Sequence, residues 1–393
     1  MNSVMNMNAQ LYSLAVPLES AFHHTRASHE VARNLILRID HEGLVALGEC
    51  VPREYVTNET IESVVRTITS INIAEVIASI CWDSSRDAVH GLLHMNWQNY
   101  FDVDSNMNAM CLLDLSLFDL VGQYFGRPVS ALIGAYALPN EPRDSTLRTV
   151  QTMDYSLSVD DFLKRGPFHH VKIKVGRSLE EDLVKIIEIQ QRVDGDVSYS
   201  IDANMAWTLD QALVSLDKLS QCRLNWCEEP LGQKDFHGYK RLREAVSLPV
   251  MLDESVYSRA DLDSAVKEGS CDSINVRLSK CGGIAQSIQL IKQARRSNIS
   301  YQLGAQVAET GPLVAAARHL AECLSDKLAY EAGQVDRFFS KPLFSPTPGV
   351  DRKTNCADRI RGNGLGIQIA EELFEYVDRV YEWKYGRWSH DGH

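Results

Sequence analysis

The chain has 393 residues, of which 45% are apolar and 23% charged, proportions typical of a folded globular protein. Its net charge of −12 disfavours nucleic acid or an anionic membrane surface as the main partner, because both require a basic face. No apolar run approaches the ~20 residues that span a bilayer, and the N-terminus lacks the layout of a signal peptide. Nine scattered cysteines without a CxxC pair are typical of a reducing compartment, so a cytoplasmic location is expected.

The first part of the chain predicts a mixed α+β segment. Strands are expected at 31–40 and 44–49, a helix at about 59–70, and a second helix in MNAMCLLDLSLFDLVGQYFG, which ends at a Gly-Arg-Pro terminator. The tail contains an amphipathic stretch, EELFEYVDRVYEW, which is expected to pack back on this segment. We therefore divide the chain into 1–135, 136–360 and 361–393.

The middle of the chain alternates short β-rich runs with amphipathic helical stretches. Alternating β and α units predict a parallel sheet, and eight of them predict a (β/α)8 barrel. A doubly wound open sheet is the alternative; the acidic strand ends described next favour the barrel, because they need strands that converge on one mouth. The eight expected strands are 147–155, 170–176, 197–204, 225–231, 249–255, 273–280, 301–306 and 328–334.

The second run, VKIKVG, places Lys172 and Lys174 on one face of a strand, because alternate residues share a face. Two lysines that face the barrel mouth would be costly unless they are paired or functional. The alternative is an exposed edge strand with solvated lysines.

Three further runs each end in acidic residues, at intervals of about 25 positions. Asp202, Glu228 and Asp253 therefore follow successive strands and are expected to converge at the C-terminal mouth. Converging carboxylates repel one another unless a cation lies among them, and hard oxygen ligands suit Mg²⁺. The alternative is a set of unrelated acids paired with Arg and Lys.

The sixth run, SINVRLSKCGG, directs Asn275 and Arg277 inward by alternation. Lys280 lies on the outer parity but beside Gly282, where the strand is expected to end. Its direction is therefore left open.

Together these motifs are similar to those of the enolase superfamily, in its muconate lactonizing enzyme-like subgroup of the mandelate racemase/muconate lactonizing enzyme family. CLLDLSLFDLVGQYFGRPVSALIG resembles the family's helix before the barrel, and VKIKVG, IDAN, CEEP, LDES and NVRLSKCGG stand in its order and at its spacing. The resemblance covers nearly the whole chain. It implies a modified (β/α)8 barrel under an α+β capping domain that the C-terminal segment completes, and a homo-oligomer.

The resemblance also implies roles for residues. Mg²⁺, with Mn²⁺ as a possible substitute, would be bound by Asp202, Glu228 and Asp253 and would hold the carboxylate of a small substrate. Lys174 would remove the α-proton to give a metal-stabilised enolate, and Lys172 would help to neutralise the charge. Three neighbours would hydrogen-bond around the site: Asn204, Glu229 and Glu254.

The sequence departs from the subgroup at Arg277, where the usual partner base is a lysine. Arginine is a poor base because it stays protonated, so a one-base elimination of water (a lyase) or a cycloisomerisation is expected. A racemase or epimerase of amino-acid derivatives or dipeptides remains an alternative, with Lys280 or Arg277 as the second base. So do a catalytically silent binding protein and, more weakly, a Schiff-base aldolase.

Substrate specificity is expected from two loops of the capping segment by family position. The loop 16–30 contains His23, His24 and Arg26, and the loop 50–60 contains Tyr55 and Arg53, which is either a clamp for a distal carboxylate or a solvated surface residue. Past strands seven and eight, Glu309 and Glu331 are candidates to receive an ammonium or hydroxyl group, or are salt-bridge partners.

Overall fold

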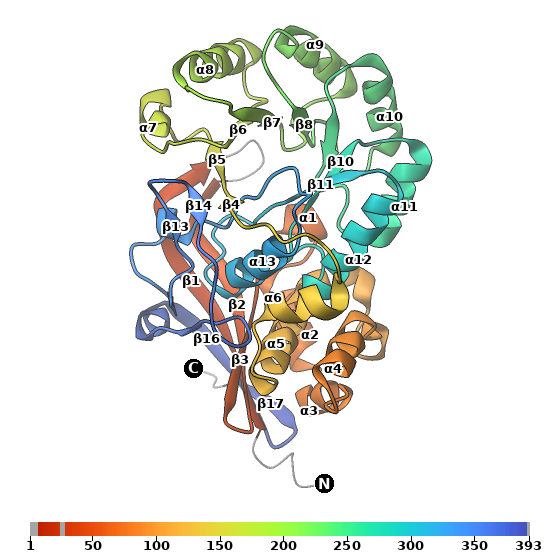
Figure 1. Cartoon of the computed structure of the whole chain (residues 1–393), viewed down its shortest axis with the longest axis vertical. Coiled ribbons are helices and arrows are strands. Elements are labelled where there is room, and N and C mark those ends of the chain that lie inside the picture. Colours follow the sequence, from red (N-terminus) through yellow and green to blue (C-terminus); the bar gives the residue numbers. More distant parts are fainter. Residues whose placement is uncertain (1–6, 24–27, 391–393) are drawn as a thin grey trace.

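The computed structural model describes residues 7–23 and 28–390. Two sheets organise it. A five-stranded antiparallel sheet has the order β17-β16-β1-β2-β3, so strands from both ends of the chain lie side by side (Figure 1). Its strands are β1 (Met7–His23), β2 (Ser28–His41), β3 (Leu44–Cys50), β16 (Val377–Lys384) and β17 (Arg387–His390).

Helices of the N-terminal part lie beside this capping sheet, and α5 (Met107–Tyr124) and α2 (Ile61–Thr69) contact its strands (Figure 1). The longest, α5, is buried along nearly its whole length and packs between β3 and the barrel helix α12 (Gly283–Arg296). The other short ones are α1 (Glu54–Thr57), α3 (Ile73–Ala78), α4 (Ser85–Leu93) and α6 (Val129–Leu132).

The second sheet is parallel, and its seven strands follow one another in chain order, as repeated βα units require. Figure 1 shows their helices in an arc around the outside. The strands are β5 (Val150–Met153), β6 (His170–Lys174), β7 (Ser198–Asp202), β8 (Trp226–Glu228), β9 (Val250–Leu252), β10 (Ser273–Val276) and β11 (Ser300–Leu303). The helices are α7 (Val159–Leu163), α8 (Leu179–Arg192), α9 (Leu209–Leu219), α10 (Phe236–Ala245), α11 (Arg259–Glu268), α12 and α13 (Pro312–Glu322).

Local sequence explains where these helices begin. Thr208 and Ser258 form capping boxes at the starts of α9 and α11, and Ser178 accepts a hydrogen bond from the first turn of α8. Each helix follows a strand and leads back to the start of the next one. The strands are therefore parallel, and their carboxyl ends lie at one edge of the sheet. That edge carries the candidate site.

The structure confirms the expected capped barrel-type fold, with differences in the eighth and first units. The run 328–334 forms a single parallel bridge, between Leu303 and Tyr330, rather than a strand. The chain leaves the extended conformation directly afterwards, because Ala332 and Gly333 adopt positive φ angles of 66° and 60°. At the first unit, β4 (Leu147–Arg148) pairs outside the barrel with β14 (Cys356–Ala357), next to β13 (Val350–Asp351).

One expectation for the ends of the chain needs correction, and the other holds. The segment 16–23 is not a loop, because β1 runs on to His23; His24 and Arg26 lie outside the described residues. The tail does pack back on the capping segment, where β16 pairs with β1 after a 3-10 turn at Glu371–Tyr376. No helix within 7–23 and 28–390 is long and apolar enough to cross a membrane.

Candidate active site

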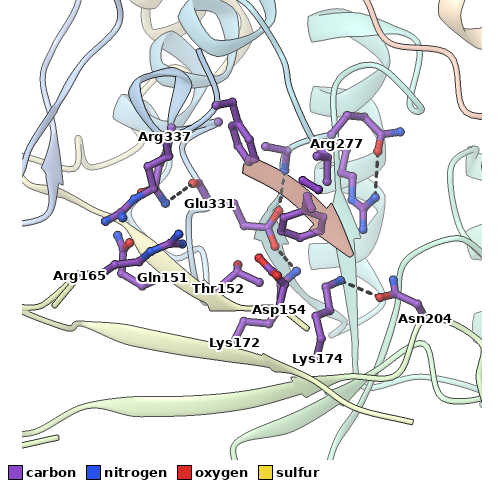
Figure 2. Close-up of a pocket in the computed structure, with 18 of the residues that line it drawn as sticks. Gln151, Thr152, Asp154, Arg165, Lys172, Lys174, Asn204, Arg277, Glu331 and Arg337 are labelled. Carbon is purple, nitrogen blue, oxygen red and sulfur yellow. Dashed lines mark hydrogen bonds and ion pairs between the residues drawn. The ribbon is translucent and has the colours of Figure 1, made fainter. Parts of the chain in front are cut away.

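A pocket lies at the carboxyl ends of the parallel strands, beside the last residues of β1 (Figure 2). The barrel strands and the loops that follow them supply most of its polar side chains. Strand β1 contributes Phe22, and α1 contributes Tyr55. Those barrel side chains include Lys172, Lys174, Asn204, Arg277 and Glu331.

Lys172 and Lys174 both project from β6 into this pocket, as alternation predicts, and both are buried. The Lys174 ammonium lies 2.5 Å from Asp202 Oδ2 and donates to Asn204 Oδ1 at 2.7 Å. Lys172 donates to Glu331 and, at 3.3 Å, to Glu228 Oε2. The alternative of an exposed edge strand is therefore wrong.

The carboxylates of Asp202 and Glu228 lie side by side, because their residues are register partners at the ends of β7 and β8. Both are fully buried. Around Glu228, Asn275 donates to Oε1 at 2.7 Å and Gln302 to Oε2 at 3.2 Å. The main chain turns sharply just past each acid: Asn204 and Glu229 adopt φ angles of 46° and 38°, the strained conformations that gather at functional sites.

Asp253 completes the row at the end of β9. It forms ion pairs with Arg277 and with Lys280, whose Nζ lies 2.8 Å from Oδ1. Behind it, Glu229 accepts hydrogen bonds from the Asp253 main-chain N–H at 2.6 Å and from Ser255. Glu254 accepts from Asn204 Nδ2 at 3.3 Å, while its Oε2 is buried without a hydrogen-bond partner among the described residues.

The lysines and the acids of this cluster stabilise one another's charged forms. Burial disfavours the Lys172 ammonium, but Glu228, Glu331 and Asp202 outweigh burial and raise its pKa. Burial likewise opposes the Asp202 carboxylate, and Lys174 and Lys172 outweigh it and lower its pKa.

Two other acids of the cluster, Glu229 and Glu254, have raised pKa values. Burial raises the pKa of Glu229 to about 8. Burial, followed by Glu229 and Asp202, raises the pKa of Glu254 to about 8 as well. Burial is thus the main factor that opposes ionisation of these two carboxyl groups.

These observations bear on a metal site. No group of three His, Cys, Asp or Glu residues in the described part of the chain is arranged to share an ion. Ammonium or guanidinium groups contact each of the three strand-end acids. The donor set nevertheless fits Mg²⁺ in its chemistry: buried carboxylates on neighbouring strand ends, excess acidic charge and an orphaned Glu254 oxygen.

Arg277 and Lys280 occupy different places. Arg277 lines the pocket on the same side as Lys174, and its Nη1 donates to Gln306 at 3.0 Å (Figure 2). Although burial opposes its charge, Glu331 and Glu228 prevail and raise its pKa. Lys280 is fully buried outside the pocket lining, where it donates to the main-chain carbonyls of Asp253 and, at 3.0 Å, Val256; burial lowers its pKa.

The residues expected to bind substrate are divided. Tyr55 and Glu331 line the pocket, whereas His23, Arg53 and Glu309 are not part of the lining that the structure describes. Arg53 is neither a solvated surface residue nor directed at the pocket, because it is buried and donates to Pro52 O and Val307 O at 3.0 and 2.9 Å. Glu309 accepts from the Gln306 N–H at 2.7 Å.

Sequence reasoning missed several lining residues. Arg165 precedes β6 in a loop, and Arg337 ends a 3-10 turn at Val335–Arg337. Neither belongs to a regular helix or strand, so no period in the sequence predicts where their side chains point. Phe22 lies on β1, whereas the sequence predicts a loop at 16–30.

Comparison with known proteins agrees with this architecture. The family model described as "Enolase C-terminal domain-like" matches residues 155–373, more than half of the chain. The chain therefore belongs to the enolase superfamily, among proteins related to the mandelate racemase/muconate lactonizing enzyme family.

Its curated relatives are enzymes. A hydrophobic dipeptide epimerase of Enterococcus faecalis is 29% identical over 78% of this chain and 84% of that protein. An N-succinyl-L-Arg/Lys racemase of Bacillus cereus is 26% identical over 76% and 79%, and a D-galactarolactone cycloisomerase of Agrobacterium fabrum is 28% identical over 67% and 72%. All three names denote isomerases.

A solved structure shares the fold. The dipeptide epimerase of Cytophaga hutchinsonii, complexed with Mg and the dipeptide D-Ala-L-Val, superposes with a TM-score of 0.80 at 24% identity. The match covers 97% of this chain and all of that one.

Proposed function

We propose that the protein removes the α-proton of a small carboxylate substrate with a single base, Lys174, and completes a cycloisomerisation or an elimination. The observation that carries this proposal is the pair of cations at one end of the pocket: Lys174 lies there together with an arginine, Arg277 (Figure 2). Arginine stays protonated, so the intermediate has one group able to take or return a proton.

Lys174 is well placed for this role. Asp202 and Asn204 fix its amine at the end of β6, and a positioned base within reach of the substrate typically contributes 10²–10⁴-fold to rate. Lys172 and Arg277 remain cationic. They would stabilise negative charge as it develops on the substrate, in a buried site where such charges act strongly.

Mg²⁺ would be held by Asp202, Glu228 and Asp253, with Mn²⁺ as a possible substitute. When bound, the ion would supply fixed positive charge at the substrate carboxylate. Its charge would also favour the ionised forms of Glu229 and Glu254, whose pKa values burial raises. Asn204, Glu229 and Glu254 would position these ligands through the hydrogen bonds described above.

Epimerisation is the second candidate, and the names of the relatives favour it. It requires a second proton carrier. Lys280 would have to leave Asp253 and two main-chain carbonyls, and Arg277 would have to lose its proton between buried carboxylates that raise its pKa. Both requirements count against this candidate. A homo-oligomer and a cytoplasmic location remain predictions.

Deuterium exchange tests the proposal. Acid sugars, N-acyl amino acids and dipeptides would be incubated with the protein and MgCl₂ in D₂O, and recovered material followed by NMR and chiral chromatography. We expect Mg²⁺-dependent conversion without accumulation of the α-epimer. Rapid formation of a deuterated epimer would instead establish the two-base reaction, and absence of exchange and conversion across the panel would contradict both.

A further inference from the structure

The cations that line the pocket differ in how they are neutralised. Lys172, Lys174 and Arg277 each form an ion pair with at least one buried carboxylate. Arg165 and Arg337 also line the pocket, yet across the described ranges neither has an acidic oxygen within 4.0 Å. Two guanidinium groups therefore face the pocket without a partner of opposite charge in contact.

These two arginines lie together, away from Lys174. Figure 2 shows Arg165 and Arg337 on one side of the pocket and Lys174, Asn204 and Arg277 on the other, with Lys172 and Glu331 between them. Different parts of the chain supply the pair: the loop between α7 and β6 supplies Arg165, and the turn after Glu331 supplies Arg337. One end of the pocket thus holds Arg165 and Arg337, and the other end holds the proposed base, Lys174.

The surroundings orient Arg337 without neutralising it. Its Nε donates to Gln334 Oε1 at 2.9 Å, and the same oxygen accepts from Arg352 Nη1 at 2.8 Å. Arg352 is itself paired with Asp336. Burial, Arg352 and Arg165 together lower the pKa of Arg337 to about 9 and outweigh the opposing charge of Asp336, as expected of a cation with no carboxylate in contact.

An acid, Asp154, lies near Arg165 but forms no ion pair with it. The Asp154 carboxylate also lines the pocket and favours the charged form of Arg165, while burial outweighs it and lowers the pKa of Arg165. Asp154 Oδ1 is committed to the Ser156 N–H at 2.6 Å. The Arg165 guanidinium remains open to the pocket.

The capping hairpin closes over this side. Phe22 meets Phe338 edge to face, with ring centroids 6.2 Å apart, and main-chain hydrogen bonds join Glu19 N to Phe338 O at 3.0 Å and Tyr155 N to His23 O at 3.3 Å. An anion bound here would be partly shielded from water, which strengthens its attraction to the arginines.

From this geometry we propose that Arg165 and Arg337 form a subsite for a second carboxylate, and that the substrate is a dicarboxylate. The two ends of the pocket would then hold the two carboxylates, with the reacting carbon at the Lys174 end. Guanidinium groups suit this task because their paired N–H donors match the two oxygens of a carboxylate. The assignment of the reacting end rests on the proposed function; the anion subsite does not.

Calorimetric titration of the Mg²⁺-loaded protein tests the subsite. Glutarate, adipate and pimelate would be compared with pentanoate, hexanoate and heptanoate, and the readout is the ratio of diacid to monoacid affinity at each chain length. We expect the wild type to prefer at least one diacid by about ten- to hundredfold. Arg165→Gln and Arg337→Gln should each remove most of that preference and leave monoacid affinity nearly unchanged.

Two variants complete the design. Arg337→Lys keeps the charge without the planar fork and should retain part of the preference. Arg241→Gln removes an exposed arginine from α10, a helix on the opposite side of the barrel from α7 (Figure 1), and should leave the ratio unchanged. Absence of any diacid preference in the wild type, or an unaltered ratio in both glutamine variants, would overturn the subsite.

The proposed function can fail separately. Lys174→Ala should retain the diacid preference, because Lys174 lies at the other end of the pocket. If the wild type showed the expected diacid preference but no deuterium exchange, the subsite would be supported and the proton-abstraction reaction contradicted.

Discussion

Lys172 and Lys174 show how two identical residues on one strand face acquire different properties. Lys172 contacts acids on both sides, Glu228 and Glu331, and their charges keep it protonated. Lys174 lies at the strand end, where one carboxylate and one neutral amide hold its amine. The geometry therefore favours Lys174 as the group that exchanges a proton and Lys172 as a fixed cation.

Replacing Lys174 by alanine tests this distinction. Turnover should fall about 10²- to 10⁴-fold, the usual contribution of a positioned base, while the circular dichroism spectrum and Mg²⁺ affinity stay close to wild type. The measurement is the initial rate of Mg²⁺-dependent substrate conversion. Undiminished conversion by the variant would show that another group takes the proton.

Arg277 should decide whether the α-carbon can be reprotonated from the other side. In Arg277→Lys, an amine able to lose its proton replaces a guanidinium that is not, so deuterium should appear in an α-epimer that the wild type does not form. Chiral chromatography coupled to mass spectrometry measures it. Arg277→Gln is the matched control, and an epimer formed by the wild type but lost in Arg277→Lys would identify arginine itself as the second base.

At the level of elements, one buried acid joins the capping sheet to the barrel. Glu49 on β3 accepts hydrogen bonds from the main-chain N–H groups of Thr310, Gly311 and Leu313 at 2.7, 3.1 and 3.0 Å, at the start of α13. The unpaired N–H groups and the dipole of a helix N-terminus favour a carboxylate there. Asn34 on β2 donates to the same acid at 2.8 Å.

Glu49→Ala should therefore destabilise the protein, because it leaves several buried N–H groups without an acceptor. We expect the free energy of unfolding to drop by roughly 2 to 4 kcal/mol, measured by urea denaturation. Glu49→Gln keeps one acceptor oxygen and should lose less. Equal stability of the alanine variant and the wild type would rule out this anchoring role.

The sequence predicted elements best where a strict period coincided with burial. In VKIKVG, period-two alternation correctly directed Lys172 and Lys174 to one face. The same reasoning missed β1, since a register shift between Ser13 and Leu14 interrupts its alternation. It also assumed a regular eighth strand where Ala332 and Gly333 break the extended chain.

Within the site, sequence could place the acids but not their partners. Asp202, Glu228 and Asp253 follow directly from strand ends. The destination of Lys280 depends on the turn after β10, where Gly282 adopts a φ of 81°, and that of Arg53 on a carbonyl of residue 307, more than 250 positions away. Such contacts are set by tertiary packing, which local patterns do not encode.

At the scale of the whole molecule, a second buried acid links a helix of the capping domain to a helix of the barrel. Asp114 on α5 is fully buried, and its Oδ2 accepts from the N–H groups of Ile284 and Ala285 at the start of α12, at 2.5 and 3.3 Å. Its Oδ1 has no hydrogen-bond partner within the described residues. Burial raises the pKa of Asp114 to about 8, although the two N–H groups oppose this.

This group should make stability depend on pH. An unfolded aspartate has a pKa near ~3.9, so between about pH 4 and pH 8 the folded state binds a proton that the unfolded state has lost. The stabilisation from protonated Asp114 is complete below about pH 4 and is lost as pH rises through about 8. Wild-type stability should therefore decline over this range by several kcal/mol, an order-of-magnitude expectation.

Asp114→Asn carries no titrating proton at this position and should show a flatter profile, most clearly between about pH 6 and pH 8. Asp119 provides the comparison: it is also buried on α5, and burial raises its pKa only to about 6, so Asp119→Asn should alter the slope below about pH 6 instead. Urea midpoints recorded at half-unit steps would separate the two. Parallel profiles for Asp114→Asn and wild type above pH 6 would mean that Asp114 is already ionised in the folded protein, and that α5 and α12 are held together by a charged contact.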